Sequence, residues 1–250
     1  MPFLKLTDVS LVYPMVGSDR KFIRRREQKD PTSAAEQNKK VGGLILGSKQ
    51  EGRGVKALDK VNISLKDGDR LAIIGRNGAG KSTLLRVMAG VYPPSEGSVT
   101  SSGKVTGLYN LNLGVNAELN GYDNIRLRCM MFGLNKQQIE EAIPEITEFA
   151  ELGEFISLPL KIYSSGMRMR LLFAIAMTLK PDILLLDEWI SAGDKYFREK
   201  ADNQMKTYMD RIPIVVVATH NLVRIQQLCT TLYDLDDERP EIKPLSELVI

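Results

Sequence analysis

GRNGAGKST, residues 75–83, matches the pattern G-x-x-x-x-G-K-[ST] of a phosphate-binding loop, or P-loop. The continuous apolar run RLAIIG (70–75) precedes it, as in a buried parallel strand, and the helical pattern KSTLLRVMAGV (81–91) follows it. A strand before the loop and a helix after it form the context that this motif requires. These residues therefore predict a nucleotide-binding loop at the edge of an α/β sheet.

Each residue type in this loop has a physical task at a bound nucleotide. The glycines let the backbone curl so that consecutive N–H groups face phosphate oxygens, and the following helix adds its positive N-terminal end. Lys81 would supply a charge to the β- and γ-phosphates, and Ser82 a hydroxyl ligand for Mg²⁺. The predicted phosphate cradle consists of Gly75, Arg76, Asn77, Gly78, Ala79, Gly80, Lys81, Ser82 and Thr83.

Two further apolar strands end in polar residues. ILLLDEW (183–189) ends in Asp187 and Glu188. Asp187 fits the acid that holds Mg²⁺ in P-loop proteins, and Glu188 is the candidate general base for an attacking water. The simpler interpretation is a pair of capping acids at a strand end.

The second of these strands, IPIVVVATH (212–220), ends in the single histidine of the chain, His220. Parallel strands place their carboxyl ends on one rim of a sheet, so we expect His220 to lie near Asp187 and the P-loop. There it would contact the γ-phosphate and sense its presence. The simpler interpretation is a structural hydrogen-bonding residue.

The composition excludes several classes of protein. The chain has 250 residues with one histidine and two cysteines, Cys129 and Cys229. These counts exclude a zinc finger, an iron–sulfur cluster, a disulfide framework and a His-rich metal enzyme. No leader sequence is visible, and no apolar run reaches the roughly 18–20 residues that cross a bilayer. We therefore expect a soluble protein of a reducing compartment, the cytoplasm.

The net charge of +3 is unevenly distributed, because residues 1–56 carry 12 basic and 6 acidic side chains and the remainder carries 22 and 25. The excess lies in residues 14–56, a basic insertion that includes KFIRRR (21–26). It predicts either a contact with an anionic partner, such as lipid headgroups or the diphosphate of a lipid-linked glycan, or a solvated loop.

A fourth motif, YSSGMRMRLLFAIA (163–176), places serines and a glycine at the start of an apolar helix. The order of P-loop, S-x-G at a helix start, apolar strand with Asp–Glu, and histidine resembles the ATP-binding subunit of ABC transporters over essentially the whole chain. YSSGM stands where that family has its LSGGQ signature. The resemblance implies the ABC ATPase fold, which is an α/β P-loop NTPase (RecA-like) core with a mostly parallel sheet, an antiparallel β edge and an inserted helical subdomain.

The same resemblance implies a division of the chain. Residues 1–112 would form the β subdomain and P-loop core, and residues 113–180 the helical subdomain with the signature. Residues 181–235 would complete the ATPase core, and residues 236–250 would be a short acidic tail without room for a carbohydrate-binding domain.

The resemblance also assigns site residues beyond the P-loop. Tyr13 matches the aromatic residue that stacks on adenine, and Asp194, in SAGD, matches the D-loop acid that contacts the site of the opposite subunit. Ser164, Ser165 and Gly166 would reach the γ-phosphate of ATP bound by the opposite subunit. Asn112, with Asn110 as the alternative, stands nearest to the position of a glutamine that completes the Mg²⁺ site in most relatives.

The details of the motifs are similar to the branch that exports lipid-linked polysaccharides such as O-antigen, capsule and teichoic acid. These details are YSSGMRMRL, DEWISAGD (187–194), ELNGYDNIRLR (118–128) and the long segment before ALDKV (57–61). The resemblance implies an ATP- and Mg²⁺-dependent ATPase that acts as a homodimer beneath two copies of a membrane permease. The subunit would lie at the cytoplasmic face of the inner membrane, with no nucleic-acid partner.

Two alternatives remain open at this point. One is an ABC ATPase for another lipid or a small-molecule cargo. The other is a soluble ABC protein that acts on ribosomes or DNA, although such proteins usually carry paired cassettes or a long coiled coil.

Overall fold

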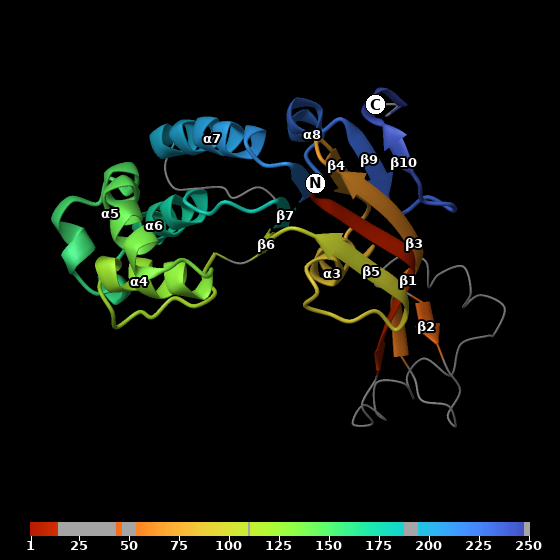
Figure 1. Ribbon diagram of the computed structural model, residues 1–250, viewed down its shortest axis with the longest axis horizontal. Coiled ribbons are helices and arrows are strands. Elements are labelled where there is room, and N and C mark those ends of the chain that lie inside the picture. The colour runs from red at the N-terminus through yellow and green to blue at the C-terminus, as the bar shows by residue number, and fades with distance from the viewer. Residues whose placement is uncertain (15–43, 47–53, 110, 188–194, 248–250) are drawn as a thin grey trace, which may run out of the picture. The chain divides into compact units, whose positions relative to one another are not determined.

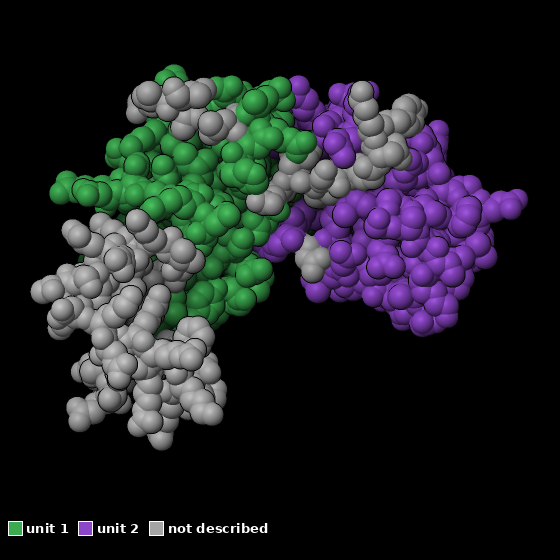
Figure 2. Space-filling model, turned by 180° about the vertical axis from the view of Figure 1, so that it is seen from behind, with its two compact units in different colours: residues 1–107, 182–188, 213–250 green, residues 108–181, 189–212 purple. Residues whose placement is uncertain are grey.

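The computed structural model describes residues 1–14, 44–46, 54–109, 111–187 and 195–247. Most of the basic insertion, together with Asn110, Glu188 and Asp194, lies outside these residues. The chain divides into two compact units, which Figure 2 shows in green and purple. Unit 1 contains residues 1–107, 182–188 and 213–250, and unit 2 contains residues 108–181 and 189–212.

The first sheet of unit 1 is antiparallel, in the strand order β2-β3-β1-β5 (Figure 1). Apolar side chains alternate along its two long strands, so that Leu4 lies opposite Leu65 and Leu6 opposite Ile63, all buried. This alternation buries one face of the sheet. The strands are β1 (Phe3–Pro14), β2 (Leu44–Leu46), β3 (Gly54–Lys66) and β5 (Glu96–Ser102).

The second sheet has the order β10-β9-β4-β8-β7-β6 and is mostly parallel. Neighbouring pairs among β9, β4, β8 and β7 run parallel, and β10 is antiparallel to β9. Every residue of β8 is buried, as expected of a strand covered on both faces. The strands are β4 (Arg70–Ile74), β6 (Val105–Leu108), β7 (Ile183–Asp187), β8 (Ile214–Ala218), β9 (Thr231–Asp234) and β10 (Ile242–Pro244).

The two sheets together confirm the expected α/β class with a mostly parallel sheet and an antiparallel β edge. The described residues of this unit also form the helices α3 (Lys81–Met88) and α8 (Leu222–Leu228) and a short 3-10 turn at Leu245–Glu247. The expected acidic tail is partly structured, because β10 pairs with β9 and Lys243 forms an ion pair of 2.8 Å with Asp237.

Unit 2 is helical, and asparagine side chains cap the start of two of its helices. The side chain of Asn120 accepts a hydrogen bond from the N–H of Asp123 at 2.8 Å, and Asn135 forms a capping box with Gln138. The elements are α4 (Gly121–Met131), α5 (Lys136–Ala150), 3-10 turns at Gly153–Ser157 and Leu160–Ile162, α6 (Ser165–Met177) and α7 (Lys195–Asp210). None of the helices in the described residues is long and apolar enough to cross a bilayer.

An aromatic cluster joins three of these helices. Phe149 of α5 lies 5.8 Å from Phe173 of α6 and 5.6 Å from Phe197 of α7, measured between ring centroids. Arg170 lies over the ring of Phe197 at 4.6 Å, and Lys200 lies over that of Phe149 at 4.6 Å. This packing explains why α7 belongs to unit 2, whereas the sequence assigned residues 181–235 to the ATPase core.

One helix of unit 2 carries a buried arginine. Arg128 on α4 is 1% exposed, and its Nη1 donates hydrogen bonds to the carbonyl oxygens of Leu111 and Leu113. Its Nε finds no acceptor among the described residues, and burial lowers its pKa below the usual value. This side chain therefore ties α4 to the two residues that flank Asn112.

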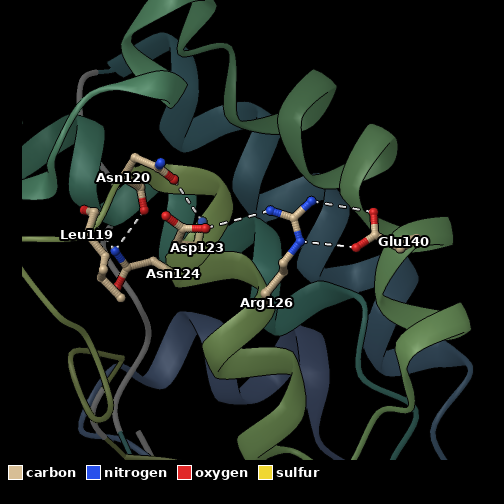
Figure 3. Close-up of polar contacts among 6 residues, drawn as sticks. All are labelled: Leu119, Asn120, Asp123, Asn124, Arg126 and Glu140. Atoms are coloured by element: carbon tan, nitrogen blue, oxygen red, sulfur yellow. Dashed lines mark hydrogen bonds and ion pairs between the residues drawn. The ribbon is translucent and has the colours of Figure 1, made fainter.

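We expect Arg128→Met to lower the free energy of unfolding by about 3 kcal/mol, because it removes the donor of the buried Leu111 carbonyl group and of the part-buried Leu113 carbonyl group. Urea unfolding of purified protein would measure the loss. Arg126→Met is the matched control: Arg126 lies on the same helix but is exposed, with Glu140 at 3.0 Å and Asp123 at 3.7 Å (Figure 3). Such surface pairs contribute little, so that variant should unfold like the wild type. Equal losses in both variants would contradict the interpretation of Arg128.

Candidate functional site

The P-loop joins β4 to α3 in a backbone conformation that needs glycine. Gly75, Gly78 and Gly80 have φ values of +140°, +87° and +104°, a region that other residues rarely adopt. A Cβ atom at Gly80 would also lie 2.7 Å from the carbonyl oxygen of Ala57 on β3. Both constraints fix the curl of the loop, as the sequence motif predicts.

The ammonium group of Lys81 lies against the backbone of the loop. Lys81 Nζ donates hydrogen bonds to the carbonyl oxygen of Gly75 at 2.6 Å and of Arg76 at 3.1 Å, so its ammonium lies across the loop. Gly80 is the N-cap of α3 and has no side chain to bond the first-turn N–H groups. The helix start and the lysine together make a site for a phosphate anion.

The strand register brings the other predicted polar residues of unit 1 to the same edge of the sheet. Ala218 at the end of β8 lies level with Ile73 of β4 and with Asp187 at the end of β7. His220 follows two residues after Ala218 and is exposed, and the N–H of the intervening Thr219 donates to the carbonyl of Ile73 at 3.3 Å. Asp187, His220 and the P-loop thus share one rim. Glu188, the predicted base, lies outside the described residues.

Tyr13, at the end of β1, contacts the last residue of the P-loop. Its hydroxyl lies 3.2 Å from the Oγ1 of Thr83, and its ring meets that of Tyr92 edge-on at 5.9 Å. Residues 70 positions apart in the sequence are thereby brought together. The stacking of this ring on adenine stays a prediction.

The signature segment is anchored by a buried tyrosine. The hydroxyl of Tyr163 donates to the carbonyl of Phe155 at 2.6 Å, and burial raises the pKa of Tyr163 to about 12. Ser164, next in sequence, is the N-cap of α6 and accepts from the N–H of Met167 at 3.1 Å. Ser164 and Ser165 are exposed and Gly166 is half-buried, so the helix start is available to a ligand.

The predicted Mg²⁺ ligands all offer oxygen donors. Ser82 and Asp187, in unit 1, offer a hydroxyl and a carboxylate oxygen, the hard donors that Mg²⁺ prefers. Asn112, in unit 2, offers an amide oxygen. The described residues include no cluster of three or more His, Cys, Asp or Glu side chains that could hold a metal. This donor set fits an ion that is shared with nucleotide phosphates rather than one held by protein alone.

Sequence reasoning missed two charged residues that adjoin the predicted site. One is Arg128, whose burial no local pattern indicates. The other is Asp236, whose carboxylate accepts a hydrogen bond of 2.6 Å from the backbone N–H of Arg76 in the P-loop. The sequence shows that Asp236 lies just after a strand, β9. It does not show that β9 lies beside β4.

Comparison with known proteins agrees with this geometry. The family profile described as ABC transporter matches residues 58–191. The chain is 40% identical over 236 residues to the O-antigen export system ATP-binding protein RfbE of Yersinia enterocolitica, covering 94% of this chain and 95% of that protein. It is 38% identical over 214 residues to the teichoic acids export ATP-binding protein TagH of Listeria innocua, covering 86% of this chain and 64% of that protein.

A solved structure shares the fold. The dimeric, post-hydrolysis ATP-binding cassette MJ0796 bound to ADP and Pi superimposes with a TM-score of 0.66 at 21% identity, over 97% of this chain and 98% of that one. The P-loop geometry, the family profile and the relatives lead to the same conclusion. The chain belongs to the ABC transporter family and is an ATP-hydrolysing cassette.

Proposed function

We propose that this chain is the ATPase subunit that powers export of a lipid-linked polysaccharide of the O-antigen type through a separate permease. The observation that carries the proposal is the 40% identity to the O-antigen export protein RfbE over nearly the full length of both chains. The similarity to TagH, named for teichoic acid export, supports the same broad class of cargo, a polymer built on a lipid carrier.

The residues of unit 1 have distinct roles in the proposed hydrolysis. The P-loop amides and Lys81 bind the β- and γ-phosphates, and Ser82 and Asp187 hold Mg²⁺, which would offset the charge of the phosphates. Glu188 orients and deprotonates the attacking water, and His220 contacts the γ-phosphate. Tyr13 packs against adenine.

The complete site needs a second copy of the chain. The exposed start of α6 offers Ser164, Ser165 and Gly166 to ATP bound by the opposite subunit, and Asp194 contacts the same site. Asn112 would complete the Mg²⁺ shell. Closure on ATP and release after hydrolysis would drive two permease copies, with the dimer peripheral at the cytoplasmic face of the inner membrane.

The alternative is an ABC ATPase for another lipid or a small-molecule cargo, and it can be tested in cells that lack this chain. We expect lipid-linked polysaccharide to accumulate inside these cells and to disappear from their surface, and the wild-type gene to restore it. Restoration should require the permease of a polysaccharide exporter rather than that of a drug exporter. Unchanged surface polysaccharide in cells without the chain would overturn the proposed cargo.

A further inference from the structure

The turn after β9 reaches the P-loop through a single acid, Asp236. Its Oδ2 accepts a hydrogen bond from the backbone N–H of Arg76 at 2.6 Å, and its Oδ1 lies 3.2 Å from the Nε of the same residue. The two residues are 160 positions apart and meet because β9 lies beside β4 in the sheet. The side chain of Asp236 is 28% exposed, and that of Arg76 is 63% exposed.

The backbone of Arg76 forms hydrogen bonds through both its N–H and its carbonyl group. Asp236 binds its N–H, while its carbonyl oxygen accepts from Lys81 Nζ at 3.1 Å and from the N–H of Ala79 at 3.1 Å. The first turn of the P-loop is therefore enclosed between the turn after β9 and the lysine that would serve the phosphates.

The turn that carries Asp236 is itself fixed in place. The N–H of Leu235 donates to the carbonyl of Ile74 at 3.1 Å, and the N–H of Asp236 donates to the Oδ1 of Asp234 at 2.9 Å. A Cβ atom placed on Gly75 would lie 3.3 Å from the Cβ of Leu235, so the loop and the turn are in close contact. These contacts hold the turn against the loop, so the carboxylate of Asp236 can fix the position of the Arg76 backbone.

From these contacts we infer that Asp236 is a positioning residue for nucleotide binding, which holds the first turn of the P-loop in its binding conformation through the N–H of Arg76. A hydrogen bond from a backbone N–H to a carboxylate is charge-assisted and strong, whereas the exposed side-chain ion pair contributes little. The Arg76 guanidinium offsets a negative charge that would otherwise oppose the phosphates. If the loop is already ordered before ATP binds, less of the free energy of binding is lost in ordering it.

The inference predicts a specific pattern of ATP affinities, measured by calorimetry with MgATP on the full chain. Asp236→Ala should raise the Kd for ATP by about tenfold and the KM in proportion, with kcat within about twofold of the wild type, since it disturbs the loop rather than the reacting groups. Asp236→Asn keeps an oxygen acceptor for the N–H but loses its charge, so it should raise the Kd less than Asp236→Ala does.

Asp237→Ala is the matched control, because Asp237 lies in the same turn and pairs with Lys243 at 2.8 Å instead of the P-loop. It should bind ATP like the wild type. Wild-type affinity in Asp236→Ala, or an equal loss in Asp236→Asn or Asp237→Ala, would overturn the inference.

A second measurement needs no variant. In the nucleotide-free wild type, the Arg76 amide should exchange with deuterium more slowly than the neighbouring loop amide of Asn77, and an unprotected Arg76 amide would contradict the proposed bond. Neither test involves the cargo, so both hold whatever cargo is exported.

Discussion

Lys81→Ala should reduce ATP turnover by at least about 100-fold, the scale on which loss of one preorganised electrostatic contact slows an enzyme. The Nζ of Lys81 lies across the P-loop and donates hydrogen bonds to the carbonyl oxygens of Gly75 and Arg76. Alanine leaves the glycine-dependent curl of the loop but removes the charge that stabilises the transferring phosphoryl group. Phosphate release by the purified protein measures the loss.

The matched control for this variant is Lys66→Ala. Lys66 is an exposed lysine in the same unit, at the end of β3, so its removal should leave turnover unchanged. Both variants should show the thermal unfolding midpoint of the wild type within a few degrees. Turnover in Lys81→Ala close to that of the wild type would mean that the loop does not bind the reacting phosphates.

Glu188→Gln should lower turnover by about 100- to 10,000-fold, the range that general acid–base catalysis contributes, while ATP binding is retained. Glutamine fills the same space but cannot take a proton from water. Because hydrolysis would be needed to separate the subunits, we expect this variant to accumulate as a dimer when MgATP is added, as measured by light scattering.

Glu141→Gln tests whether the effect is specific, since Glu141 is an exposed acid on α5, 2.9 Å from the Nε2 of Gln137. It should hydrolyse ATP at the wild-type rate. Unaltered turnover in Glu188→Gln would remove Glu188 as the base, and a variant that stays monomeric with MgATP would contradict the proposed paired sites.

The sequence predicted the parts of the site that depend on short spacings. The P-loop needs only nine consecutive residues, 75–83, to specify its glycine conformations and the start of α3, and the apolar runs of β4, β7 and β8 have no alternation because both faces are covered. The shared rim of Asp187 and His220 followed from the general behaviour of parallel strands.

Contacts between distant segments could not be predicted in this way. No single segment of the sequence determines the order of strands in a sheet. The contact between Asp236 and Arg76 depends on that order, because β9 lies beside β4. In the sequence Arg128 is one more charge in a helical segment, and only the packing around it reveals its burial. The membership of α7 in unit 2 likewise depends on Phe197 meeting aromatic rings from two other helices.

The decisive measurement is ATP-dependent movement of the polymer across a membrane. Inside-out vesicles that contain this chain and its permease would be given radiolabelled lipid-linked polysaccharide on their outer face. We expect MgATP to transfer the glycan into the lumen, where an added glycosidase cannot degrade it, and Glu188→Gln to abolish this protection. Protection that proceeds equally without ATP, or without this chain, would contradict the proposal that its ATPase activity powers export.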